Sequence, residues 1–232
     1  LSTITLVEGF TSAQFIAQLK QRTDLVDDLA ATPSTLPDDV STLLGKQLGL
    51  EGGSLEGWLY PDTYRYAPGS KISDLLKRAV RLQREELDKA WSQRDPASPL
   101  KTPYDALIMA SIVEKETGKA SDRPKVSSVF NNRLRVGMML QTDPTVIYGV
   151  GPSFDGNLTR RHLQTDTPYN SYTRTGLPPT PIANPSKASL YAAVRPEETP
   201  YYYFVAKGDG GSYFSKNLNE HNQAVRKYQL GR

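Results

Sequence analysis

A single stretch of the chain is apolar on almost every side and still carries two glutamates near its end. Residues 107–117 read LIMASIVEKET, preceded by Thr102 and Pro103, which are favourable at the cap and at the first position of a helix. Gly118 follows, and glycine is common where a helix stops. Because a helix that is apolar all round is buried, we expect residues 102–117 to form a buried helix.

The two glutamates of this helix point in different directions. With about 100° of rotation per residue, Glu116 falls in the middle of the apolar arc that contains Met109 and Ile112. Glu114 falls beside Leu107 instead. Burial in apolar surroundings raises the pKa of a carboxyl group and keeps its proton available near neutral pH, as a general acid requires. Glu116 is therefore the candidate catalytic acid.

Each glutamate also has a structural interpretation. Glu116 lies at the helix end, where a side chain either turns out to solvent or pairs with an arginine such as Arg133. Glu114 has small neighbours, and for it we expect a structural hydrogen bond or a salt bridge. The pattern alone leaves these alternatives open for Glu116.

Missing residue types exclude several kinds of chemistry. The chain has no cysteine, which excludes disulfides, cysteine-ligated metals and a thiol nucleophile. Its two histidines, His162 and His221, lie far apart and lack the spacing of metal ligands. We expect no metal, no cofactor and no Ser/His/Asp triad, so acid–base chemistry must rest on carboxylates, Lys or Tyr. We expect His221 to be a surface residue or a hydrogen-bonded one.

Composition and charge indicate a globular chain. Of its 232 residues, 38% are hydrophobic, and 13 Tyr, 6 Phe and 2 Trp are too many aromatic residues for a disordered chain. The net charge is +3, and basic residues cluster only in pairs such as Arg160 and Arg161, so we expect no nucleic-acid partner. No apolar run approaches the roughly 18–20 residues that span a bilayer, so we expect no membrane contact by this chain itself.

The periodicity predicts an α+β fold, in which helices pack with short antiparallel strands that lie mostly near the ends. Residues 24–50 hold only short helical fragments, broken by Pro33, Pro37 and Gly45. Residues 138–184 are rich in glycine and proline, and we expect a long ordered loop region that lines a cleft. The other expected elements are a strand at 3–7, a helix capped by Thr11 or Ser12, an extended segment or strand pair at 55–66, helices at 70–91, 122–136, 184–194 and 217–230, and a hairpin of 201–206 with 212–214.

Two polar clusters lie in and beside this loop region. The first joins Asn132 and its neighbours to residues 140–149, LQTDPTVIYG, and the second is residues 168–173, PYNSYT. Amides, hydroxyls and aromatic rings suit a sugar, which presents hydroxyl groups and apolar C–H faces. The alternatives are a turn or helix cap at Asp143 and an ordered proline-rich surface loop around Tyr169.

Several long strings in one order carry a family resemblance. They are EGWLYPDTY at 56–64, MASIVEKET at 109–117, VSSVFNNRL at 126–134, LQTDPTVIYG at 140–149, YNSYT at 169–173, TGLPP at 175–179 and NLNEHN at 217–222. Together they resemble the family of endolytic murein transglycosylases called MltG or YceG-like. The resemblance implies an N-terminal strand–helix segment at residues 1–52 and the transglycosylase catalytic core at residues 53–232.

The resemblance also implies a reaction. Members cleave the β-1,4 bond between N-acetylmuramic acid (MurNAc) and N-acetylglucosamine (GlcNAc) inside glycan strands, without water, and leave a 1,6-anhydroMurNAc end. The second glutamate of the family's Glu-Lys-Glu motif is the catalytic one and matches Glu116, acting first as acid and then as base. Asp143 is expected either to bind substrate or to steer the C6 hydroxyl and stabilise charge. The expected substrate-binding residues are Gln141, Asp143, Tyr148, Asn132, Asn170 and Tyr172.

Place and partners follow from the same resemblance. The family's N-terminal membrane anchor and LysM-like module are not visible in this sequence, which begins at Leu1. We therefore expect the catalytic portion of a longer protein at the periplasmic face of the cytoplasmic membrane, with peptidoglycan strands as substrate and cell-wall synthases as partners. The rival functions are a murein hydrolase that uses water and a non-catalytic glycan-binding module.

Overall fold

The computed structural model describes residues 1–29 and 36–231, so the predicted break at Pro33 lies outside the described residues. It confirms an α+β fold of helices with short antiparallel strands. The elements in chain order are β1 (Ser2–Thr5), α1 (Ser12–Lys20), α2 (Pro37–Gln47), β2 (Thr63–Tyr66), α3 (Ile72–Ser92), α4 (Pro103–Glu116), η1 (Ala120–Asp122), α5 (Arg123–Val136), α6 (Asp143–Val150), η2 (Gly151–Ser153), α7 (Arg160–Gln164), α8 (Lys187–Val194), β3 (Tyr203–Ala206), β4 (Ser212–Ser215) and α9 (Leu218–Tyr228).

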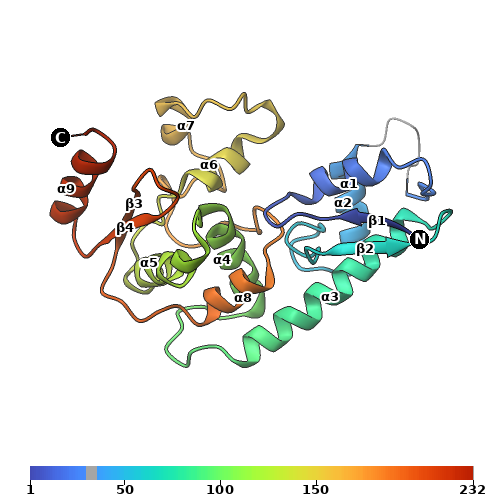
Figure 1. Cartoon of the computed structure of the whole chain (residues 1–232), viewed down its shortest axis with the longest axis horizontal. Helices are drawn as coiled ribbons and strands as arrows, with labels where there is room; N and C mark the ends of the chain where they lie inside the picture. The colour runs from blue at the N-terminus through green and yellow to red at the C-terminus, as the bar shows by residue number, and fades with distance from the viewer. Residues whose placement is uncertain (30–35, 232) are drawn as a thin grey trace.

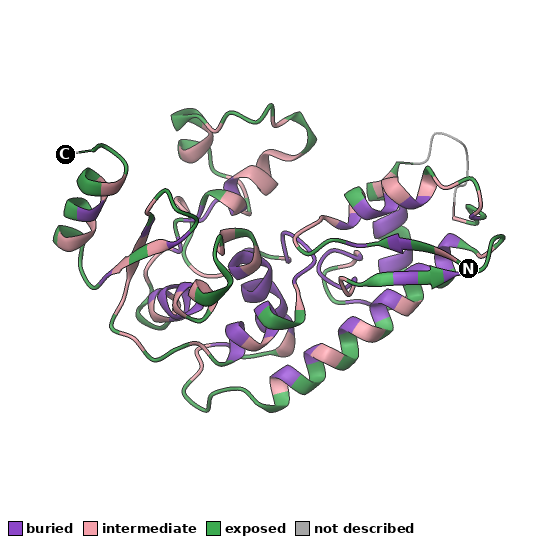
Figure 2. Ribbon diagram, viewed as in Figure 1, coloured by how far each residue is buried: buried purple, intermediate pink, exposed green. Residues whose placement is uncertain are grey.

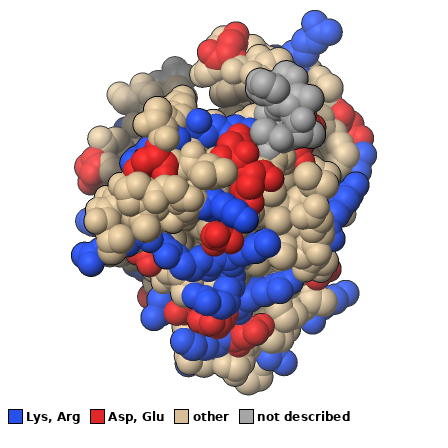
Figure 3. All heavy atoms as spheres, turned by 90° about the vertical axis from the view of Figure 1, so that its right-hand side faces the viewer, with Lys and Arg blue, Asp and Glu red and all other residues tan. Residues whose placement is uncertain are grey.

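The molecule is longer than it is wide. Figure 1 shows β1, β2, α1 and α2 grouped at one end, which we call the N-terminal lobe, and α9 at the other end. Between them lie α4, α5 and α8, with α6 and α7 above. On the outer face of the N-terminal end, Lys and Arg side chains form a band interrupted by Asp and Glu (Figure 3).

Helix α4 is the predicted buried helix. Thr102 caps it by accepting the backbone N–H of Asp105 at 3.1 Å, and Pro103 occupies its first turn. Every residue from 106 to 113 is buried, and α4 packs against α8, α5 and α3. The apolar sequence of α4 is therefore matched by helices on several sides, which fixes the position of its last residue, Glu116.

The N-terminal lobe contains two paired strands that lie far apart in the sequence. Strand β1 pairs antiparallel with β2, with Ser2 opposite Tyr66. Helix α1 begins with a capping box between Thr11 and Gln14, as the predicted cap at Thr11 requires. Strand β1 lies before residue 52 and β2 lies after it, and the family resemblance implied a division there between the N-terminal segment and the core. The strand pairing therefore connects the two predicted parts.

The predicted break at Gly45 is wrong, whereas the one at Pro37 coincides with the start of a helix. Pro37 begins α2, since the missing N–H of proline costs nothing in the first turn of a helix. Helix α2 continues through Gly45, where a Cβ atom would clash with the backbone of Ser54. Gly45 lets the backbone at Ser54 pack closely against α2. This packing outweighs the cost of glycine within a helix, which is about 1 kcal/mol.

Helix α3 carries the predicted apolar stripe and connects the two halves of the molecule. It runs from the N-terminal lobe toward α8 (Figure 1) and packs against both α4 and α8. Gln83 is buried in this stripe, where its amide donates to the Gly57 carbonyl at 2.9 Å. The buried apolar positions of the helix are Ile72, Leu75, Leu76, Ala79, Val80, Leu87 and Ala90.

The loop-rich region also contains short helices. Within residues 138–184, α6 begins at Asp143 and Pro144, so this motif starts a helix, although no side chain of the motif caps it. Helix α7 covers only Arg160–Gln164. Residues 165–186 form turns and extended segments without a regular helix or strand.

The C-terminal segment packs loosely. Strands β3 and β4 form the predicted hairpin, with Tyr203 opposite Ser215, and α9 lies against this hairpin. Asn217 caps α9 by accepting the N–H of Glu220 at 2.9 Å. Ala224 alone among the residues of α9 is buried, and Figure 2 shows the contrast with α4. Helix α9 therefore takes little part in the core.

Candidate active site

Glu116 lies at the wall of a cavity of about 620 Å³. The packed helix α4 ends at this residue, so its side chain leaves the core where the cavity begins. The other walls come from α5, the loop before α6, Tyr172, the β3–β4 hairpin and α9. Segments from residue 116 to residue 229 thus meet around one carboxyl group.

The surroundings of Glu116 favour its protonated form. Burial, followed by the negative charge of Asp143, raises its pKa from 4.5 to about 7. Within the described ranges Glu116 forms no ion pair. A carboxyl group with a pKa near 7 holds and releases a proton at neutral pH, as a general acid does.

Arg133 is not the partner of Glu116. Its Nε donates to the Tyr202 carbonyl at 2.7 Å, and its Nη1 donates to the carbonyls of Met139 and Leu140 at 3.0 and 3.4 Å. These bonds tie the loop before α6 to the start of the hairpin. The ion-pair alternative for Glu116 is therefore wrong.

Glu114 has the structural role expected for it. Its Oε1 accepts the backbone N–H of Ser186 at 2.7 Å and the hydroxyl of Ser189 at 3.1 Å. Both donors lie at the start of α8, so Glu114 holds that helix against α4. The two glutamates of the motif thus serve different purposes on different sides of α4.

Asp143 and Tyr172 form a pair at the cavity wall. Asp143 is the first residue of α6, and its Oδ1 accepts the Tyr172 hydroxyl at 2.6 Å. Burial, followed by the hydrogen bond to Asp143, raises the pKa of Tyr172, so its hydroxyl remains a donor. The pair fixes the carboxylate whose charge acts on Glu116.

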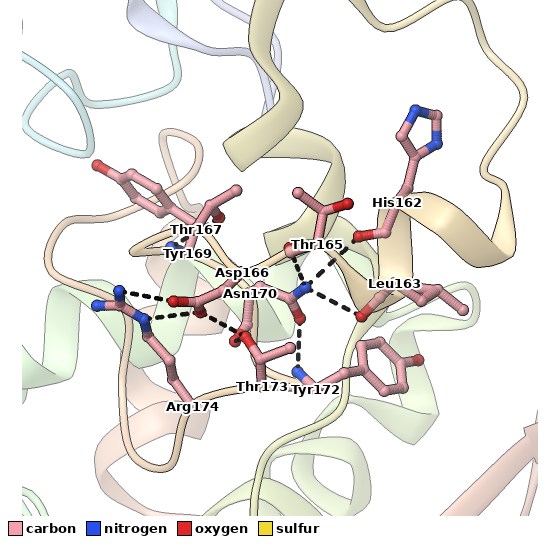
Figure 4. Close-up of polar contacts among 10 residues, drawn as sticks. All are labelled: His162, Leu163, Thr165, Asp166, Thr167, Tyr169, Asn170, Tyr172, Thr173 and Arg174. Carbon is pink, nitrogen blue, oxygen red and sulfur yellow. Dashed lines mark hydrogen bonds and ion pairs between the residues drawn. The ribbon is translucent and has the colours of Figure 1, made fainter.

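Asn170 lies beneath this pair and does not line the cavity. Figure 4 shows its amide inside the loop, where Nδ2 donates to the carbonyls of Leu163 and Thr165 at 3.0 and 2.8 Å. Its Oδ1 accepts the backbone N–H of Tyr172 at 2.8 Å. The structure therefore gives Asn170 the position of a residue that holds Tyr172 in place.

Gln141 has a strained backbone at the cavity. Its φ of 48° lies in the left-handed region, and among the described residues it is the one non-glycine with a positive φ. Its own N–H donates to the Ser171 carbonyl at 3.1 Å, and the N–H of Thr142 donates to the Ser171 hydroxyl at 2.9 Å. On the N-terminal side of Gln141, the Arg133 guanidinium donates to the carbonyls of Met139 and Leu140. Such strain costs of order 1–3 kcal/mol, persists where neighbours enforce it, and is concentrated at functional sites.

Two other predicted site residues lie outside the cavity. The Asn132 amide donates to the carbonyls of Thr199 and Tyr201 at 3.0 and 2.8 Å. The Tyr148 hydroxyl donates at 2.8 Å to Oε2 of Glu56, a carboxyl group that is 7% exposed and whose pKa burial raises to about 7. The structure therefore gathers Glu116, Gln141, Asp143 and Tyr172 at the cavity, but not Asn132, Tyr148 and Asn170.

His221 is a cavity residue that the sequence analysis placed elsewhere. Its ring stacks on Tyr203 with centroids 5.0 Å apart, and both residues line the cavity. Burial, followed by the charge of Arg133, lowers the pKa of His221, so the ring is neutral at pH 7. The sequence shows where His221 lies in the string NLNEHN. It does not show that the helix carrying His221 packs against the β3–β4 hairpin and borders the cavity.

No group of three His, Cys, Asp or Glu side chains in residues 1–29 and 36–231 is arranged to hold a metal ion. In the same ranges, no helix combines the length and the hydropathy needed to cross a bilayer.

Comparisons with known proteins agree with one another. A model of the YceG-like family matches residues 1–227. An endolytic murein transglycosylase of Bacillus subtilis is 37% identical over 222 residues, which cover 94% of this chain and 59% of the relative. One of Streptococcus pneumoniae is 29% identical over 226 residues, which cover 95% of this chain and 40% of the relative. A crystal structure of a YceG-like protein from Listeria monocytogenes matches with a TM-score of 0.68 and 31% identity, covering 96% of this chain and 76% of that one.

Proposed function

Because the chain belongs to the YceG-like family, we propose that it cuts murein glycan strands at internal MurNAc–GlcNAc bonds as the catalytic part of an endolytic murein transglycosylase. The observation that carries this proposal is the carboxyl group of Glu116, which has a pKa of about 7, no ion-pair partner among the described residues and a cavity beside it. Relatives named endolytic murein transglycosylase match over most of this chain.

Glu116 acts twice in the proposed reaction. In the first step it donates its proton to the bridging oxygen, the bond from MurNAc C1 to that oxygen breaks, and positive charge develops at C1. In the second step the Glu116 carboxylate takes the proton from the C6 hydroxyl while that oxygen bonds to C1. The product is a 1,6-anhydro ring, and no water is consumed. One carboxyl group suffices because the nucleophile belongs to the same sugar and is already close.

Asp143 supports both steps. Its negative charge keeps Glu116 protonated before the reaction and stabilises the positive charge at C1 during it. Tyr172 orients the Asp143 carboxylate, and Asn170 holds Tyr172. Gln141, fixed in its strained conformation, lines the cavity. Its Oε1 accepts from Arg133 Nη1 at 3.5 Å, and its Nε2 is proposed to donate to a hydroxyl or acetamido oxygen of the sugar.

A second carboxylate at the cavity favours one competing function. Asp143 offers a base for a water molecule, which would make the protein a murein hydrolase with Glu116 as acid. Hydrolysis leaves a reducing end that is heavier by one water than the anhydro end. Mass spectrometry of the digested strands distinguishes the two products. A glycan-binding module without catalysis, the remaining alternative, releases no fragments at all.

The decisive experiment replaces each glutamate of α4 in turn. Glu116→Gln should lower the release of anhydro ends about 10²- to 10⁴-fold, since the proton donor is lost. Glu114→Gln is the matched control, because an amide oxygen still accepts the bonds from Ser186 and Ser189. Retained cleavage in Glu116→Gln together with loss in Glu114→Gln would contradict the assignment.

The proposed substrate also sets the place of action. Peptidoglycan lies outside the cytoplasmic membrane, so we propose that the protein works there, on the periplasmic or outer face. Cell-wall synthases are proposed partners, since cutting nascent strands sets where synthesis ends. Co-purification of the full-length protein with a synthase from cross-linked cells tests this part.

A further inference from the structure

Helix α9 presents two sides to the rest of the molecule. With about 100° per residue, Ala224 and Tyr228 lie on one side, where Ala224 is buried and the Tyr228 ring contacts Tyr213 of the hairpin. A neighbouring side, within an arc of about 60°, lines the Glu116 cavity. Its residues are Leu218, Asn222, Val225 and Gln229, with His221 at the border between the two sides.

The cavity side of α9 has the spacing of a packed helix face but is not packed. Positions that recur every three or four residues normally cover a core, yet Leu218 is 56% exposed and Asn222 and Gln229 are exposed. The side chains of Asn222 and Gln229 have no hydrogen bond to any described residue. His221 Nδ1 likewise has no hydrogen-bond partner in the part of the chain that the structure describes. These groups are therefore free to bind a molecule in the cavity.

The same side is uncharged. It combines two aliphatic residues, two amides and an imidazole that Arg133 and burial keep neutral. Glu220 and Lys227 lie on the other sides of α9, and Arg226, about 40° round the helix from Asn222, does not line the cavity. Arg133, which also borders the cavity, has its guanidinium engaged by backbone carbonyls.

We propose that α9 forms a glycan subsite, in which its cavity side holds an uncharged N-acetylated sugar ring adjacent to the bond that Glu116 cleaves. This inference rests on the proposed function. The aliphatic side chains match the C–H face of a sugar, and the amides match its hydroxyl and acetamido groups. The peptide stems of murein carry carboxylates, for which arginine or lysine would be the fitting residues. The neutral face therefore selects the sugar and not the stem.

The test measures binding of glycan to the chain that cannot cut it. Full-length protein carrying Glu116→Gln is titrated with murein strands freed of their stems by an amidase, and with strands that retain them. Adding Asn222→Ala or His221→Phe should weaken binding of both kinds of strand about three- to ten-fold each, as expected for one lost hydrogen bond. Gln223→Ala is the matched control, because Gln223 is an exposed amide that lies about 100° further round the helix.

The variants are chosen so that folding does not confuse the result. Asn222 is exposed, and His221→Phe keeps an aromatic ring on Tyr203, so melting temperatures should stay close to that of the parent. Unchanged affinity in both variants would overturn the subsite. A loss confined to stem-bearing strands would overturn the assignment to the sugar.

The outcome also separates this inference from the function on which it rests. If the wild-type chain releases no anhydro ends but binding still depends on Asn222, the proposed chemistry fails and the subsite stands. If the wild-type chain cuts strands and the α9 variants bind them normally, the subsite alone fails.

Discussion

Two walls of the Glu116 cavity are built in opposite ways. On one side, residues 106–113 of α4 are all buried, and the loop before α6 is tied down by Arg133 and Ser171. On the other side, Ala224 alone among the residues of α9 is buried. The contrast fits two different roles. The carboxyl group, which must be placed accurately, lies on the packed wall, and the free side chains proposed to bind a ligand lie on the loosely packed one.

The largest expected effect tests the packing of the two walls directly. Leu107→Ala removes a fully buried side chain of α4 and should lower the free energy of unfolding by about 2–5 kcal/mol. Leu218→Ala, at an exposed position of α9, should change it by less than about 0.5 kcal/mol. Urea titration of the two variants measures both values. Similar losses would mean that α9 is packed as firmly as α4.

The next effect separates chemistry from binding. Asp143→Asn removes the charge beside Glu116 while the amide oxygen still accepts from Tyr172. We expect kcat to fall about 10- to 100-fold with little change in KM, whereas Asn222→Ala should raise KM and leave kcat unchanged. Because the Asp143 charge raises the pKa of Glu116, its loss should also move the alkaline limb of the kcat profile to lower pH. An unmoved limb would show that Asp143 does not act on Glu116.

A smaller effect concerns stability on the packed wall. The folded pKa of Glu116 is about 7 against an ordinary 4.5, so the folded state binds this proton more tightly than the unfolded state. The resulting stabilisation is present at low pH and is lost as pH rises from about 4.5 to about 7. Glu116→Gln should therefore be about 1–2 kcal/mol more stable than wild type at pH 8 and nearly equal to it at pH 4. Melting curves at the two pH values check the sign.

The smallest effect concerns the strained loop. Gln141→Gly relieves a positive φ, offset by the greater freedom of glycine in the unfolded chain, and should raise the free energy of unfolding by about 0.5–1 kcal/mol. Turnover should fall in the same variant because the amide is lost. Gln141→Asn, which tolerates this conformation and keeps an amide, should lie between the two. A less stable glycine variant would show that the strain is absent.

Local patterns predicted the parts of the molecule that local physics determines. The cap at Thr102, the apolar run of α4 and the opposed directions of Glu114 and Glu116 follow from residues within one helix. Gly45 misled the prediction, because its reason is the backbone of Ser54, which packs on it.

Partners distant in sequence could not be predicted. Tyr148 meets Glu56, which lies 92 residues earlier, and the Asn132 amide meets carbonyls that lie 67 and 69 residues later. The range of the last helix was predicted, but the sequence does not tell whether a core or a cavity faces it. His221 was therefore missed, although its position in the helix was correct.

The spacing between the two glutamates of α4 determines which of them reaches the cavity. Glu114 anchors α8, and Glu116, two positions later, reaches the cavity. One alanine inserted between them would swing the second carboxyl group by about 100° and leave the composition of the helix almost untouched. The site therefore depends on the number of residues between the two glutamates as well as on their identity, and an insertion here should be more damaging than many substitutions.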